Sequence, residues 1–152
     1  MIRRLALAGL AVALLSACSQ APGGVDKLTL DNAINDAIGD PGTCVLIGEP
    51  GAAKPYQFGK HAACDRALPA CREPGTRTAE DLFKATAAGA PLASASCPSQ
   101  PDGSRIVGWA AGTIKGQALV YAAVMEGSST PPGLVMADKL EGAFRKAGLQ
   151  KD

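Results

Sequence analysis

The chain has 152 residues, with 15 Lys and Arg against 14 Asp and Glu, and its aromatic residues are one Trp, two Tyr and three Phe. This balance of charge excludes the clustered basic excess of a nucleic-acid binder, and so few aromatic residues provide little surface for stacking bases or sugars. The length suits one domain, whose core must consist mainly of Ala, Val, Leu and Ile.

The first residues have the organisation of an export signal. Arg3 and Arg4 precede an apolar run from Leu5 to Leu15, and small residues follow it. A mature transmembrane helix needs about 20 apolar residues, so this run is too short to be one. We therefore expect residues 1–17 to be a signal peptide that is removed.

The end of this signal has a specific motif. Leu15-Ser16-Ala17-Cys18 resembles the lipobox of bacterial lipoproteins, in which the cysteine is acylated and becomes the first residue of the mature chain. The resemblance implies that Cys18 attaches the protein to a lipid bilayer. Because Ser19 rather than Asp follows Cys18, it also implies sorting to the outer membrane, on the periplasmic side. The alternative is an ordinary secretory signal that leaves Cys18 as a free thiol.

The remaining chain divides into a tether and a domain. Residues 18–27 are predicted to be the lipidated cysteine and a flexible tether, because Ser19 to Asp26 is rich in small residues, Pro and Gly. Residues 28–152 are predicted to form a single disulfide-stabilised α+β domain. Removal of Arg3 and Arg4 with the signal leaves 13 basic against 14 acidic residues.

A helix and a hairpin are the first predicted elements of the domain. Thr29 is expected to cap a helix that Gly39 ends. Between them, apolar residues recur every four positions at Leu30, Ile34 and Ile38. Two extended segments separated by turn residues then predict a hairpin, Thr43–Gly48 and Pro55–Gly59.

The middle of the chain is less regular. Residues His61 to Arg77 have no apolar period and several Pro and Gly residues, which predicts a loop that its cysteines must stiffen. Thr78, with Asp81 three positions on, has the spacing of a capping box and predicts a second helix that ends at Gly89. Pro91 to Cys97 is predicted to be a short edge strand.

The last third predicts the centre of the sheet and a final helix. Ser104–Ile114 and Ala118–Met125 are predicted strands on either side of a short turn. Leu119 to Met125 is apolar at nearly every position, so both faces of this strand must be covered, by helices on one side and by packed loops on the other. Leu134–Ala147 has one apolar face and predicts a helix that Gly148 ends.

Together these elements predict the α+β class. Their order is helix, two strands, helix, two or three strands, helix, which indicates an antiparallel sheet of about five strands with helices packed on one face.

Four cysteines remain once Cys18 is assigned to lipid. An even number in an exported chain indicates two disulfides, for which three pairings exist. We favour Cys64 with Cys71, which closes a small loop, and Cys44 with Cys97, which ties two distant strands. A zinc site built from His61 and these thiols is the alternative, but the chain has no Cys-x-x-Cys and an oxidising compartment favours disulfides. We expect no metal and no cofactor.

Sequence motifs for catalysis are missing. The chain has no Gly-x-Ser-x-Gly, Ser-x-x-Lys or Lys-Thr-Gly. His61 is the only histidine, and as a base it would have to serve Ser104, Ser128 or Ser129, although nothing in the local sequence pairs them.

Two fold resemblances cover parts of the chain. The block from Val107 to Gly148 resembles the last strands and terminal helix of the serine β-lactamase and penicillin-binding fold, which implies a hydrolase or an inactive relative, although the nucleophile motif is missing. The overall element order resembles profilin-like and roadblock-like domains. That resemblance implies a helix-flanked five-stranded antiparallel sheet that binds partners or small ligands.

The sequence therefore predicts a non-catalytic binding or structural module of the cell envelope, with an envelope protein or a small molecule as its partner. Candidate contacts are Trp109, the Gly127–Gly133 loop and the His61–Arg77 loop, because function tends to lie on loops held by a rigid scaffold. The alternative is a small hydrolase-like enzyme on a β-lactamase-type sheet.

Overall fold

The computed structural model describes residues 21–151, so the predicted signal peptide, the lipobox and Cys18 lie outside the described residues. The elements in chain order are η1 (Pro22–Gly24), α1 (Lys27–Ile38), β1 (Thr43–Gly48), β2 (Tyr56–Phe58), α2 (His61–Cys64), β3 (Leu68–Pro69), β4 (Thr76–Arg77), α3 (Ala79–Ala87), β5 (Ala93–Pro98), β6 (Ile106–Ile114), β7 (Leu119–Gly127) and α4 (Gly133–Lys146). None of the helices in this part of the chain has the length and hydropathy needed to span a bilayer.

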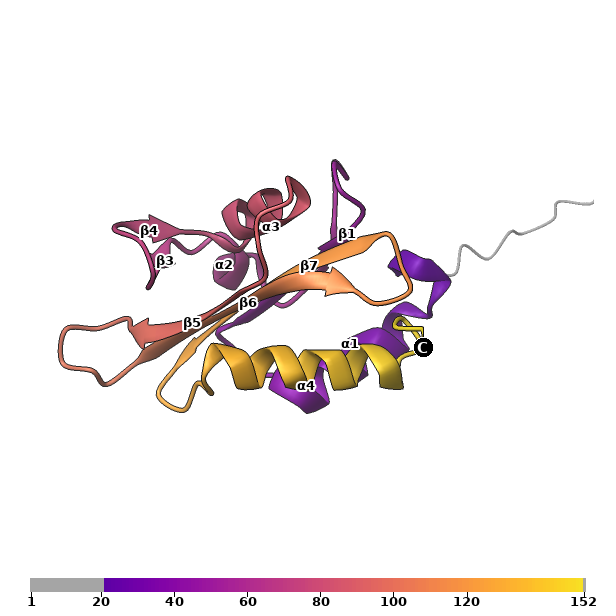
Figure 1. Cartoon of the computed structure of the whole chain (residues 1–152). Helices are drawn as coiled ribbons and strands as arrows, with labels where there is room; N and C mark the ends of the chain where they lie inside the picture. The colour runs from indigo at the N-terminus through magenta and orange to yellow at the C-terminus, as the bar shows by residue number, and fades with distance from the viewer. Residues whose placement is uncertain (1–20, 152) are drawn as a thin grey trace, which may run out of the picture.

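A five-stranded antiparallel sheet organises the molecule (Figure 1). Its strands lie in the order β2-β1-β7-β6-β5, and β3 and β4 form a separate two-stranded piece. Every residue of β7 is buried, which confirms that the apolar run after Leu119 is the centre of the sheet. The α+β class and the order of the main elements are as predicted.

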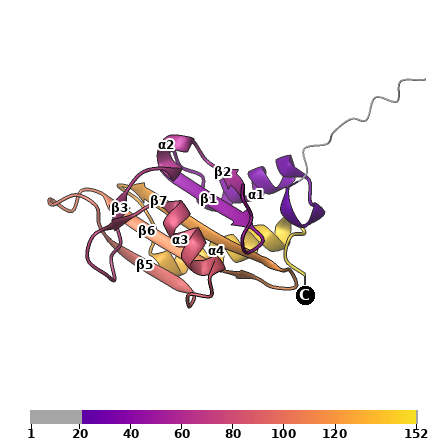
Figure 2. The same cartoon turned by 90° about the horizontal axis from the view of Figure 1, so that it is seen from above.

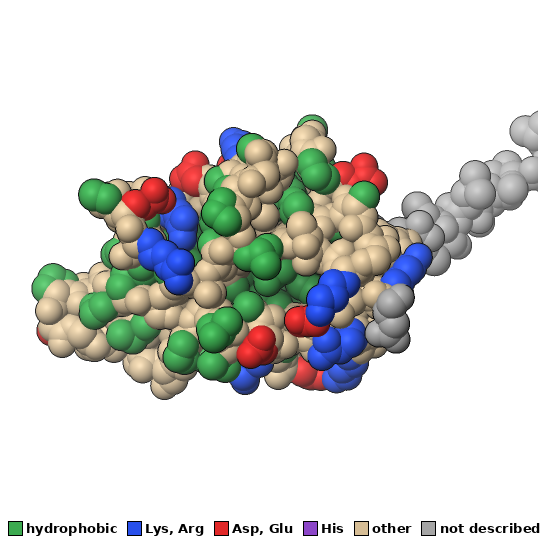
Figure 3. Space-filling model, viewed as in Figure 1, with side chains coloured by type: hydrophobic (Ala, Val, Ile, Leu, Met, Phe, Trp, Pro, Cys, Tyr) green, Lys and Arg blue, Asp and Glu red, His purple; other side chains and the backbone are tan. Residues whose placement is uncertain are grey.

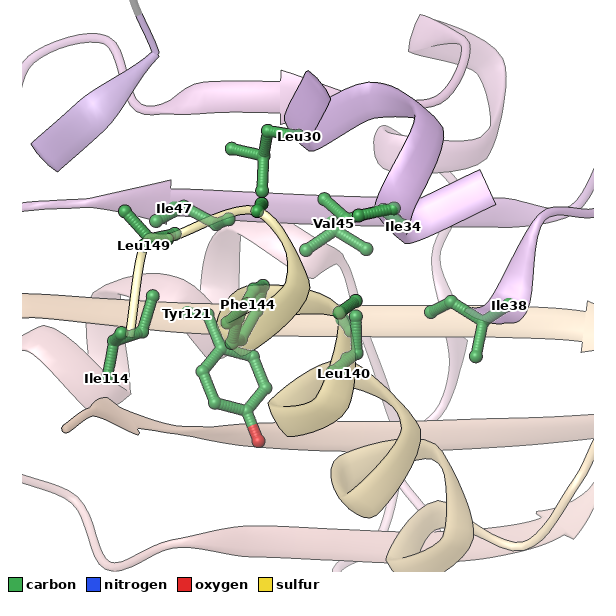
Figure 4. Close-up of a cluster of buried hydrophobic side chains, with 14 of the residues drawn as sticks. Leu30, Ile34, Ile38, Val45, Ile47, Ile114, Tyr121, Leu140, Phe144 and Leu149 are labelled. Carbon is green, nitrogen blue, oxygen red and sulfur yellow. The ribbon is translucent and has the colours of Figure 1, made fainter. Parts of the chain in front are cut away.

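Helices α1 and α4 cover one face of this sheet. Their apolar residues meet side chains of β1, β6 and β7 in one continuous core, drawn in Figure 4. Within it the rings of Tyr121 and Phe144 lie edge to face, with centroids 5.2 Å apart. The apolar residues of this core recur about every four positions in the helices and at alternate positions in the strands, so each element turns one apolar side toward it.

Shorter elements cover the opposite face. Helix α3 packs on β7 and β1 through Leu82 and Phe83, and α2 and the β3–β4 piece lie beside it (Figure 2). Thr78 and Asp81 form the predicted capping box. Cover on both faces was predicted, but the placement of all helices on one face was wrong: α3 packs on the face where packed loops were expected, because the two long helices reach only the other face.

The start of the domain also differs from the prediction. Asp26, not Thr29, caps α1, and its carboxylate accepts hydrogen bonds from the Thr29 N–H at 2.8 Å and from the Thr29 hydroxyl at 2.9 Å. Ala21 is only 6% exposed and belongs to the α1/α4 core. Residues 21–27 are thus part of the folded domain rather than of a flexible tether, because Ala21 is packed in the core and its N–H bonds to the Val25 carbonyl, and α1 begins at Lys27.

Candidate functional site

Two disulfides fasten the segment between α2 and β4 to the sheet. Cys44 pairs with Cys64, with 5.1 Å between their Cα atoms, and Cys71 pairs with Cys97, with 5.5 Å between theirs. The predicted pairing was wrong for a topological reason. β1 and β5 are three strand spacings apart, about 14 Å, whereas bonded cysteines have Cα atoms within about 7 Å. Cys44 and Cys97 therefore cannot meet.

Residues 61–77, called the arm below, consequently cross the sheet from β1 to β5. The arm was predicted to be a loop, but it contains α2, β3 and β4. Beneath it, the Trp109 Nε1 donates a hydrogen bond to the Pro69 carbonyl at 2.8 Å, and the Arg77 guanidinium carbon lies 4.8 Å from the indole ring centroid. Trp109 is fully buried, so it supports the arm and is not the exposed contact that was predicted.

A buried carboxylate near the end of β7 was missed by the sequence analysis. Glu126 is 1% exposed and accepts hydrogen bonds from Arg66 of the arm at 2.8 Å, from Ser99 at 2.7 Å and from Arg105 at 2.6 and 2.7 Å. These donors, Arg105 first, lower the pKa of Glu126 to about 2 in spite of its burial. The available signal was one acidic residue directly after an apolar run. Because Arg66 belongs to the arm and Glu126 to β7, their ion pair fixes the arm to the sheet.

The open edge of β5 offers unpaired backbone groups. The Ser99 N–H donates to the Arg105 carbonyl at 2.9 Å, so in this antiparallel register the odd-numbered residues of β5 bond to β6. The amides and carbonyls of Ser94 and Ser96 therefore point away from the sheet. No group in residues 21–151 bonds to them. Pro98, the next outward position, has no N–H to offer, as is usual for an edge strand.

Walls flank this edge on both sides. Cys71 and Arg72 of the arm lie along one side, and Pro132 to Leu134, at the start of α4, lie along the other. They enclose a shallow groove of about 380 Å³. A second hollow of about 240 Å³ shares Ser94 and Leu134 with it and continues toward α4. We call the two together the β5 groove.

Close packing holds both walls in place. At Gly133 a Cβ would lie 2.4 Å from the Trp109 carbonyl oxygen and 2.6 Å from the Ala95 amide nitrogen, so only glycine lets α4 begin this near the strand. The Gly133 N–H donates to the Ser96 Oγ at 2.7 Å. On the other wall Cys71 has a φ of 69°, the only positive φ at a non-glycine residue in residues 21–151. That conformation costs about 1 kcal/mol or more, and the disulfide to β5 maintains it.

The rim of the β5 groove is apolar. Leu92 is 71% exposed and Leu134 is 65% exposed, and both line the hollow that continues toward α4. In Figure 2, β5 lies at the edge of the sheet, on the side of the molecule that faces the viewer in Figure 3. Figure 3 shows hydrophobic side chains gathered across the middle of this surface. Large exposed leucines beside an open strand edge are typical of an interaction surface.

Two of the predicted contact regions meet at this groove. The His61–Arg77 loop supplies one wall, and the end of the Gly127–Gly133 loop supplies the other. Nothing in the sequence indicated that these segments face each other across β5. The place of β5 at the end of the strand order confirms the prediction of a short edge strand at Pro91 to Cys97, and the Ala-Ser-Ala-Ser alternation before Cys97, followed by Pro98, suits an open edge.

The residues considered for catalysis and metal binding do not come together. His61 lies on α2 and lines a different hollow, with Asp65 and Glu80. Ser104 bonds to Asp102 instead, and in residues 21–151 no hydrogen bond joins His61 to Ser104, Ser128 or Ser129. All four cysteines proposed as zinc ligands are in disulfides, and this part of the chain holds no cluster of three or more His, Cys, Asp or Glu suited to a metal ion.

Comparison of the chain with protein-family models, with curated proteins and with solved structures finds no match. The chemistry of the β5 groove is therefore derived from its own residues. These are outward backbone donors and acceptors at Ser94 and Ser96, apolar side chains at Leu92 and Leu134, and the exposed cation Arg72. Backbone groups of this kind pair with an extended chain.

Proposed function

We propose that this protein is a lipid-anchored lipoprotein of the outer membrane, facing the periplasm, and that it is a non-catalytic module which binds an extended polypeptide segment along β5. The observation that carries the binding proposal is the open edge of β5 between its two walls. The anchor rests on the lipobox at Leu15–Cys18 and on Ser19 after it. The disulfide pairs, Cys44–Cys64 and Cys71–Cys97, suit an oxidising compartment.

The added strand would extend the sheet by backbone hydrogen bonds to Ser94 and Ser96. Side chains of such a strand alternate between the two faces of the sheet. Those opposite Ser94 and Ser96 face α4 and the exposed Leu92 and Leu134, so they should be apolar. Pro98 ends the available edge, so a short segment suffices.

The charge of Arg72 determines which side chain we expect between the two apolar residues of the ligand. The residue between the two apolar ones faces the arm, where Arg72 is exposed and makes no ion pair with any residue in 21–151. An acidic side chain at this position would meet the guanidinium. The occupant we propose is thus an extended segment in which apolar residues flank an acidic one.

A second copy of the chain fits this groove less well. Each copy carries walls on both sides of its β5, from the arm and from the start of α4. Two strands pair only when about 4.8 Å apart, so pairing of two β5 edges would bring the arm and the start of α4 of each copy against those of the other. A single extended segment has no such walls.

The binding experiment uses the purified protein and synthetic peptides with alternating apolar and acidic residues. We expect these peptides to bind, and matched peptides with lysine in place of the acidic residue to bind at least tenfold more weakly. Ser94→Pro removes one outward N–H without removing a bond to β6, so it should abolish binding. Ser94→Ala keeps the N–H and should bind as the wild type does.

Arg72→Glu gives an independent check, because it should reverse the preference in favour of the lysine peptides. Equal binding by Ser94→Pro and the wild type would refute strand addition, and so would failure of every alternating peptide to bind.

Attachment to lipid has its own measurement. Mass spectrometry of the protein purified from membranes should show a chain that starts at an acylated Cys18 and lacks residues 1–17. A free thiol at Cys18 would overturn the anchor but leave the β5 groove unaffected.

A further inference from the structure

The folded domain begins very close to the proposed lipid attachment. The Ala21 N–H donates to the Val25 carbonyl at 3.1 Å, and Ala21 itself is buried. Gly23 has a φ of 73°, and a Cβ there would lie 2.6 Å from a methyl carbon of Leu149. The chain is thus packed against the domain from Ala21 onward, three residues after Cys18.

Ala21 lies at one end of an elongated molecule. Next to it are the turn between β6 and β7 and the C-terminal residues, joined by a hydrogen bond from the Lys151 N–H to the Lys115 carbonyl at 3.2 Å. We call residues 21–25, 115–118 and 148–151 the anchor pole. In Figure 1 the β5–β6 and β7–α4 loops form the opposite end of the molecule.

The segment that joins Cys18 to Ala21 can span only a short distance. Three residues span at most about 11 Å, even when fully extended. A domain of this length has a radius of gyration of about 14 Å, so the tether is shorter than the domain is wide. A domain held this tightly at one pole cannot turn its opposite end to the membrane.

We infer that the anchor pole faces the headgroup surface of the bilayer, and that the β5–β6 and β7–α4 loops point away from it. This inference rests on the proposed lipidation of Cys18. Its consequence concerns the β5 groove, because β5 itself runs along the side of the molecule between the two ends (Figure 2). The groove then stays open to the periplasm at the side, and a polypeptide can enter it without displacing lipid.

The test measures which amides lie near the lipid surface. The full mature protein is placed in nanodiscs of phosphatidylethanolamine and phosphatidylglycerol that contain a small share of a lipid with a gadolinium chelate on its headgroup. Paramagnetic relaxation of the Gly116 and Gln117 amides, at the anchor pole, should be at least tenfold stronger than that of Asp102 and Gly103, in the β5–β6 loop. This contrast follows from the steep dependence of the effect on distance.

The matched variant has a flexible spacer of about ten glycine and serine residues inserted between Gln20 and Ala21. It keeps the anchor and the domain, and it should reduce the difference between the two ends to less than threefold. Equal relaxation at both ends of the unmodified protein, with acylation confirmed by mass spectrometry, would overturn the orientation alone. Absence of acyl chains would overturn both the anchor and the orientation.

Discussion

The two faces of the sheet are stabilised in different ways. On one face α1 and α4, 12 and 14 residues long, bury a continuous apolar core that includes Leu30, Leu140 and Phe144. On the other face α3 has nine residues, and the rest of the cover is the arm, held by two disulfides and by the ion pair of Arg66 with Glu126. Helices with a wide apolar stripe need no cross-link, whereas short irregular segments bury too little to be fixed by packing alone.

This difference places the candidate site. The β5 groove has one wall from each kind of cover, the rigid start of α4 and the cross-linked turn at Cys71. A short segment can hold Arg72 beside the strand edge only because a covalent bond replaces the apolar area that it lacks. Binding residues on a cross-linked loop next to a rigid helix fit the general placement of function on loops.

The largest effect is expected from the helical face. Phe144→Ala removes a ring that is almost fully buried against Tyr121, and it should lower the free energy of unfolding by about 3–5 kcal/mol. Urea unfolding measures the loss. Leu134→Ala, on the exposed side of the same helix, is the control and should change stability by less than about 0.5 kcal/mol. Similar losses for both variants would contradict the assignment of the core.

The arm provides the next test. Cys71→Ser with Cys97→Ser opens a loop of 26 residues and should cost about 3.5 kcal/mol. Hydrogen exchange should accelerate more in the arm and β5 than in α4, since α4 is held by packing and changes only through the loss of global stability. Equal acceleration in α4 and in the arm would show that the two faces are not stabilised independently. In this variant the alternating peptides should also bind less tightly, because Arg72 loses its position.

The smallest of the three effects concerns Glu126. The pKa of its folded carboxyl is lowered to about 2, from an ordinary value of 4.5, so it stabilises the fold above pH 4.5 and this contribution is lost as the pH falls toward 2. The lowering of this pKa corresponds to about 3 kcal/mol at neutral pH. Glu126→Gln should lose this amount at pH 7 and should unfold with a weaker dependence on pH between 4.5 and 2.

The control for Glu126→Gln is Glu73→Gln, which removes an exposed carboxylate 3.6 Å from Arg77 and should change stability by less than about 0.5 kcal/mol. An unchanged pH dependence in Glu126→Gln would show that the carboxylate does not hold the arm.

The sequence predicted much of the sheet and little of the groove. β-Branched and aromatic residues on either side of a short turn located β6 and β7, and the Thr78–Asp81 spacing located the start of α3. The sequence did not predict the features that depend on contacts between residues far apart in the chain. The favoured pairing of Cys44 with Cys97 overlooked the strands between them, and Trp109 was expected at the surface because nothing local shows that the arm covers it. Glu126 was overlooked because its partners, Arg66 and Ser99, are remote in the chain.

By itself the sequence determined the α+β class, the apolar faces of α1 and α4 and the central position of β7, because these follow from local periodicity and from the hydrophobicity of single segments. Only the tertiary structure decided which cysteines pair, that Ala21 belongs to the core, and that the arm and the start of α4 flank the open edge of β5. These features depend on the order of strands in space, and that order is set by the packing of the whole chain rather than by any one segment of it.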